Sequence, residues 1–120
     1  MYLDKRLKPY VNAFVRDAKD HGIIVTLPKR INISWGWIFP GNVVGICEKT
    51  VSIISIEESF WNTAKPPLKR WVIYHELGHW LGLEHDEDEL AIMHHTIPAD
   101  DILVKLPWKK LVHQMMEKKQ

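Results

Sequence analysis

The stretch HELGHWLGLEH, from His75 to His85, constrains this chain more than any other feature. His75 and His79 are four residues apart, so on an α-helix they lie on one face, about 6 Å apart along the axis. Neutral imidazole is a strong zinc ligand, and the two rings can bind one cation. Glu76 follows the first histidine, where its carboxylate can act as a general base on water beside the metal. The pattern predicts two metal ligands and a base on one helix.

Gly82 gives the third histidine its role. His85 comes ten residues after the first histidine, and on a continued helix it would point away and lie too far along the axis. Glycine accepts the positive φ of a helix C-terminus, so the chain can turn there and bring His85 back to the metal. Three protein ligands leave the fourth position of a tetrahedral zinc ion open, which is typical of a catalytic site.

The rest of the chain predicts an α+β fold in a single domain, residues 1–120. Apolar residues at helical spacing between Pro9 and Gly22 indicate an amphipathic helix, and two prolines open the helix that carries the histidines. Runs rich in β-branched and aromatic residues indicate strands, and Pro40-Gly41-Asn42 indicates a turn. The predicted helices are 9–20, 66–81 and 107–118, and the predicted strands are 22–28, 30–38, 43–47 and 51–57, the last two forming a hairpin.

Composition excludes several classes of function. The formal net charge is +1, which gives no electrostatic reason to expect nucleic acid or an anionic membrane as a partner. No apolar run approaches the roughly 20 residues of a membrane span, and MYLDKRLKPY has no apolar core of a signal peptide. We therefore expect a monomer that is cytoplasmic as synthesised.

The complete motif resembles the elongated zinc signature of the metzincin metallopeptidases. Met93 follows His85 by eight residues, a spacing similar to the methionine turn of the matrixins, and GICEKTVSIISIEESFW resembles the strands and link before their active-site helix. The resemblance implies a zincin-like fold with a reduced mixed sheet and an antiparallel edge strand, Val43–Cys47, that binds a peptide substrate. It also implies one Zn²⁺ held by His75, His79 and His85, with Met93 as a floor that does not coordinate. The chain is also similar to very small metallopeptidase-like proteins of phages and prophages.

Several residues near the motif keep two interpretations. Trp71 matches the floor of the matrixin S1′ pocket, or it is a core residue. His95 stands where astacins and serralysins carry a tyrosine, so it can bind the metal or stabilise an oxyanion, although a surface histidine of the turn is the simpler interpretation. Asp86 is interpreted as a support to the third ligand or as part of the solvated acidic run 84–89. That run lacks any calcium-loop spacing, so no structural calcium is predicted.

Two other functions compete with a zinc endopeptidase that uses Glu76 as its base. A three-histidine metal-dependent endoribonuclease is one, because bacterial ribosomal-RNA maturation enzymes have a similar histidine spacing. They carry glycine where this chain has Glu76, and RNA binding normally needs a basic surface. A non-catalytic binding module stabilised by zinc is the other, but it would not need a general base or an open ligand position. The sequence favours the endopeptidase.

Overall fold

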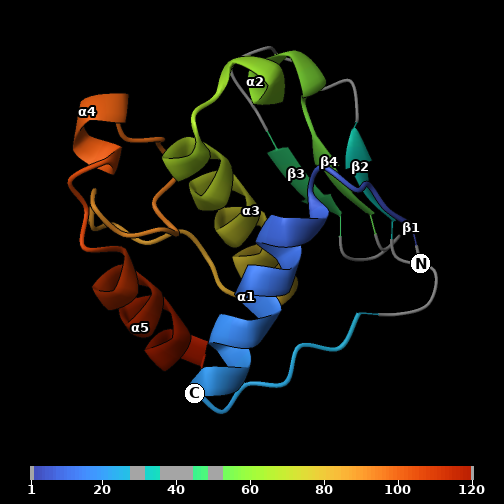
Figure 1. Ribbon diagram of the computed structural model, residues 1–120. Helices are drawn as coiled ribbons and strands as arrows, with labels where there is room; N and C mark the ends of the chain where they lie inside the picture. Colours follow the sequence, from blue (N-terminus) through green and yellow to red (C-terminus); the bar gives the residue numbers. More distant parts are fainter. Residues whose placement is uncertain (1, 28–31, 36–44, 49–52, 120) are drawn as a thin grey trace.

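The computed structural model describes residues 2–27, 32–35, 45–48 and 53–119. In chain order the elements are β1 (Tyr2–Leu3), α1 (Lys8–Asp20), β2 (Asn32–Trp35), β3 (Gly45–Glu48), β4 (Ile53–Ile56), α2 (Glu58–Thr63), α3 (Pro66–Trp80), α4 (Asp100–Leu103) and α5 (Trp108–Lys119). Helix α3 lies at the centre, with the sheet and α1 on one side of it and α4 and α5 on the other (Figure 1). The predicted α+β class is confirmed.

The sheet has the strand order β1-β2-β4-β3. Strand β1 runs parallel to β2, and β2 runs parallel to β4. Strand β3 pairs antiparallel with β4, in a register that places Gly45 opposite Ile56 and Glu48 opposite Ile53. Among the described strands β3 therefore lies at one margin of the sheet, and the two-residue β1 lies at the other.

The buried side chains form one core between the sheet and the helices. The middle of helix α3 is enclosed on all sides, because every residue from Trp71 to Gly78 is buried. Phe14 of α1 meets Tyr74 of α3 edge to face with ring centroids 5.1 Å apart, and Trp108 of α5 contacts the same tyrosine at 5.0 Å. The Tyr74 hydroxyl donates a 2.5 Å hydrogen bond to Asp17. The helix that carries His75 and His79 is thus held between two other helices.

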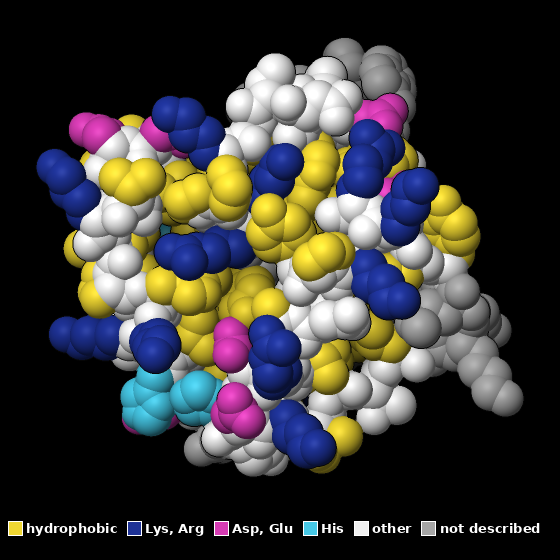
Figure 2. Space-filling view, viewed as in Figure 1, with side chains coloured by type: hydrophobic (Ala, Val, Ile, Leu, Met, Phe, Trp, Pro, Cys, Tyr) yellow, Lys and Arg dark blue, Asp and Glu magenta, His cyan; other side chains and the backbone are white. Residues whose placement is uncertain are grey.

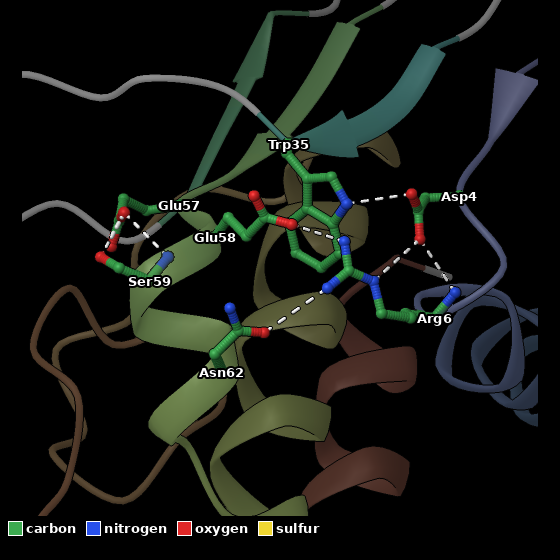
Figure 3. Close-up of polar contacts among 7 residues, drawn as sticks. All are labelled: Asp4, Arg6, Trp35, Glu57, Glu58, Ser59 and Asn62. Atoms are coloured by element: carbon green, nitrogen blue, oxygen red, sulfur yellow. Dashed lines mark hydrogen bonds and ion pairs between the residues drawn. The ribbon is translucent and has the colours of Figure 1, made fainter.

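A polar network joins the segment between β1 and α1 to Trp35 of β2 and to helix α2 (Figure 3). Asp4 accepts hydrogen bonds from the Trp35 indole and from the Arg6 backbone, both at 2.9 Å. The Arg6 guanidinium lies 4.3 Å from the centroid of the Trp35 ring and donates to Glu58 at 2.5 Å and to Asn62 at 3.5 Å. The segment between β1 and α1, strand β2 and helix α2 are therefore joined through one arginine.

Helix α2 is not predicted from the sequence, although a capping residue marks its start. Glu57 caps the helix by accepting hydrogen bonds from the backbone N–H groups of Ser59 and Phe60, at 3.0 and 2.8 Å. The Ser59 hydroxyl, which also donates to this carboxylate, and the two backbone donors hold the pKa of Glu57 below its usual range. Six residues are too few for a clear apolar period, which is why the segment was interpreted only as a link.

The strand predicted at 22–28 is wrong over its described part. The structure places residues 23–27 in irregular chain, outside any strand of the described residues. The alternation itself is real, because Ile23, Val25 and Leu27 are half-buried against the core while Ile24 is exposed. An alternation of apolar residues indicates which side chains are buried, but it does not show that the segment pairs with another strand. The predicted turn at 40–42 and the first two residues of the predicted edge strand, 43 and 44, lie outside the described residues.

Basic side chains lie over several tryptophan rings. Figure 2 shows Lys and Arg side chains spread among hydrophobic ones on the face that carries α1, α3 and α5. Three of these cations lie over tryptophan rings: Arg6 over Trp35 at 4.3 Å, Lys69 over Trp61 at 5.1 Å and Arg70 over Trp108 at 4.3 Å. Such contacts stabilise the rings that they cover, of which Trp35 and Trp108 are half-buried and Trp61 is buried. Within the part of the chain that the structure describes, every helix is too short or too polar to cross a membrane.

Candidate metal centre

The structure brings the three predicted metal ligands together. The Nε2 atom of His79 lies 3.2 Å from that of His75 and 3.2 Å from that of His85. The potential ligand atoms of all three residues lie within 4.8 Å of one another, so one ion can be bound by all of them. His75 is buried, His79 is half-buried and His85 is exposed, so the cluster opens to solvent on the side of the third ligand.

The ring of His75 is fixed from two sides. Its Nδ1 lies 2.7 Å from the carbonyl oxygen of Ile92, which can only accept a hydrogen bond, so Nδ1 carries the proton and Nε2 has its lone pair free. Trp71, one helical turn earlier, stacks on the imidazole with ring centroids 4.8 Å apart and an angle of 16° between the planes. The contact with the Ile92 carbonyl could not be predicted from the sequence. A backbone acceptor leaves no signal in the sequence.

The end of α3 is a Schellman motif, and this motif positions the other two ligands. The Gly82 N–H donates to the His79 carbonyl at 2.9 Å, and the Leu83 N–H donates to the Gly78 carbonyl at 3.0 Å. Gly82 has φ +93°, as the motif requires and as the sequence predicted. The same turn places the Leu83 carbonyl 2.9 Å from Nδ1 of His79, so it orients the second ligand while it directs the chain back toward the third.

We expect Gly82→Ala to lower the free energy of unfolding by about 1–2 kcal/mol, because a Cβ disfavours positive φ even where there is room for it. No atom outside the neighbouring residues lies within 4 Å of a Cβ built on Gly82. Gly22→Ala is the matched control: it ends α1 at φ +80°, with equal space around it. Urea unfolding should show similar losses for both variants, whereas metal affinity should fall only for Gly82→Ala. Equal metal affinity in the two would contradict the role of this turn.

Burial and mutual repulsion keep the buried ligand neutral. The pKa of His75 is lowered to about 4, chiefly by burial and also by its histidine neighbours, against the opposing effect of the hydrogen bond to the Ile92 carbonyl. The pKa of His85 is also lowered, first by its partial burial and then by the nearby histidines. A neutral imidazole is the form that binds a metal, so this environment favours ligation at neutral pH.

Glu76 is the only buried carboxylate among the described residues, with 6% of its surface exposed. Burial raises its pKa to about 7. A group with a pKa near the working pH can accept a proton and return it in the next step. A divalent cation beside the carboxylate would favour its ionised form. The residue therefore suits acid–base chemistry at a metal site.

Met93 packs directly beneath the helix that carries the ligands. It is 3% exposed, and a Cβ built on Gly78 would lie only 2.4 Å from its sulfur. Gly78 lies on α3 between the first two histidines, so the absence of a side chain there lets the thioether approach the helix backbone. Met115 of α5 reaches the same spot, 2.7 Å from the same built atom.

The remaining predicted residues are distributed as follows. His95 is exposed, with its ring centroid 6.1 Å from that of His85, and it does not belong to the ligand cluster. Its role at the metal stays a prediction. His94 is buried and donates from Nδ1 to the Asp86 carbonyl at 2.9 Å. Trp71 is 2% exposed, and its indole nitrogen has no hydrogen-bond partner among the described residues.

The comparison with protein families agrees with this geometry. Residues 57–111 match the family model of the matrixins, described as Matrixin. The matched segment contains the three histidines, Glu76 and Met93, and it covers slightly less than half of the 120 residues. Over this segment the resemblance to the metzincin metallopeptidases is confirmed. No curated protein and no solved structure matches the chain.

Proposed function

We propose that this protein is a zinc-dependent endopeptidase. The observation that carries the proposal is the convergence of three imidazole Nε2 atoms, two of them from the helix that also carries the buried Glu76, within a segment that matches the matrixins. Three neutral nitrogen donors with one open side fit a catalytic zinc ion. The family match and the histidine cluster together support a metallopeptidase over the other functions considered.

The residues of the site have different roles in the proposed reaction. His75, His79 and His85 would hold the ion, which supplies Lewis acidity that activates water at neutral pH and polarises a carbonyl. Glu76 accepts the proton of the attacking water and passes it to the amine that leaves. The Ile92 and Leu83 carbonyls keep two of the imidazoles in the tautomer that presents Nε2.

We further propose that the substrate binds as an extended peptide beside β3. This strand lies at a margin of the described sheet, and helix α3 packs against it. An extended peptide can add to such a margin through backbone hydrogen bonds, which would bring its scissile bond across the metal. Backbone hydrogen bonds between β3 and a peptide do not depend on the peptide's sequence, so pockets for its side chains would determine which peptides are cleaved.

A digest of a proteome-derived peptide library, read by mass spectrometry, tests this function. The protein is compared in two states, stripped of metal by a chelator and then reloaded with zinc. We expect new peptide termini only in the reloaded sample, with a shared preference around the cleaved bonds. If the reloaded protein binds zinc and produces no new termini, the endopeptidase proposal is wrong, and RNA becomes the next substrate to test.

A further inference from the structure

Asp86, the residue after the third ligand, has every polar group engaged. Its backbone N–H donates to the Met93 carbonyl at 2.9 Å, and its own carbonyl accepts from Nδ1 of His94 at 2.9 Å. One carboxylate oxygen accepts from the Asp88 N–H at 2.9 Å, and the other is paired with the ammonium group of Lys118. Four contacts thus join this residue to the methionine turn, to its own loop and to the C-terminal helix.

The third ligand itself lacks the support that the other two have. Among the described residues, carbonyl groups orient the rings of His75 and His79 through Nδ1, whereas the structure shows no such acceptor for His85. His85 is exposed and lies in irregular chain beyond the end of α3. Its position therefore depends on the backbone that carries it, and Asp86 is where that backbone is fixed.

The ion pair between Asp86 and Lys118 is not reinforced by close packing around it. A cavity of about 320 Å³ separates the loop from α5, and a second one of about 340 Å³ lies beside His85. Both cavities are lined by Asp86, Met93 and Lys118, so the ion pair lies between the two cavities. The side chain of Asp86 is only 15% exposed, while that of Lys118 is 57% exposed. The carboxylate is largely covered, and the lysine reaches it from the surface of α5.

We propose that Asp86 and Lys118 are positioning residues for the third metal ligand, so that the last turn of α5 contributes to metal affinity. The inference rests on the metal site of the proposed function and not on peptide cleavage. An ordered Asp86 holds His85 at the distance from His79 that one ion requires. Without the lysine the carboxylate keeps only its bond to Asp88, and the loop can move into the adjacent cavities.

The first measurement is the zinc affinity of the metal-free protein, by competition with a chromogenic chelator. We expect Lys118→Met to weaken binding about threefold, as befits a half-exposed ion pair. Asp86→Ala should weaken it about tenfold or more, as for other residues that support a ligand. Lys118→Arg should retain most of the affinity. Lys119→Met, the adjacent lysine of α5, is the matched control and should bind zinc as the unsubstituted protein does.

The decisive measurement repeats Lys118→Met in a protein that already lacks the third ligand. In the His85→Ala background the lysine substitution should have no further effect on zinc affinity, because there is no imidazole left to position. An equal loss in both backgrounds would mean a general effect on the fold, and no loss in either would mean that the ion pair is irrelevant; each result overturns the inference. Failure of the unsubstituted protein to bind zinc would overturn it together with the metal site, whereas zinc binding without cleavage affects only the proposed function.

Discussion

Glu76→Ala is expected to retain zinc and to cleave peptides about 10³-fold more slowly than the unsubstituted protein. General acid–base catalysis contributes about 10²–10⁴-fold in enzymes, and no other buried carboxylate among the described residues can replace this one. The three imidazoles hold the ion without the glutamate, so metal content should be unchanged. The measurement pairs the initial rate on a peptide from the library digest with the zinc content of the same sample.

The control for this experiment is Glu89→Ala, which removes an exposed carboxylate from the acidic loop. It should match the unsubstituted protein in both rate and zinc content. Both variants are purified in the same way, so a contaminating peptidase would be equally active in every sample. Full activity in Glu76→Ala would remove the proposed mechanism, and loss of zinc from it would show that the carboxylate supports the ion as well.

His85→Ala is expected to weaken zinc binding by about 100-fold or more. Even residues that only support a ligand change affinity by about 10- to 100-fold, and loss of a ligand should have at least that effect. The remaining pair, His75 and His79, lies on one helix and would bind the ion from a single side. Chelator competition measures the affinity directly, without any assumption about the substrate.

His113→Ala serves as its control, because this exposed histidine lies on α5, outside the cluster of His75, His79 and His85. Its affinity should equal that of the unsubstituted protein. A His85→Ala protein that still binds zinc at full strength would show that the third ligand is misassigned. His95, whose ring centroid is 6.1 Å from that of His85, would then be the first substitute to test.

The sequence predicted the helices and their ends better than the sheet. Val11, Phe14 and Ala18 recur at the helical period and are all buried on α1, and Gly22 and Gly82 both adopt the positive φ that their places implied. These signals are local, since they depend on residues within one or two turns. Strand pairing joins distant segments, so the parallel contact of Tyr2 with Asn32 had no local signature.

The same difference between local signals and contacts of distant segments explains which parts of the metal centre could be predicted. The ligands and the base follow from spacing on one helix and one turn, and the structure brings the three ligands together. Their supports could not be predicted, because the Ile92 and Leu83 carbonyls are backbone atoms common to every residue type. Lys118 pairs with an aspartate 32 residues earlier, a separation that no motif records.

The turn at Gly82 offers a way to detect whether the metal site is occupied. Helix ends open locally at little cost, so their amide hydrogens usually exchange rapidly with solvent. Here the amides of Gly82 and Leu83 close the turn between His79 and His85, so an ion bound by both imidazoles would link the two sides of that turn. Slow exchange at these two amides would then mark the occupied site, and rapid exchange the empty one, without any substrate.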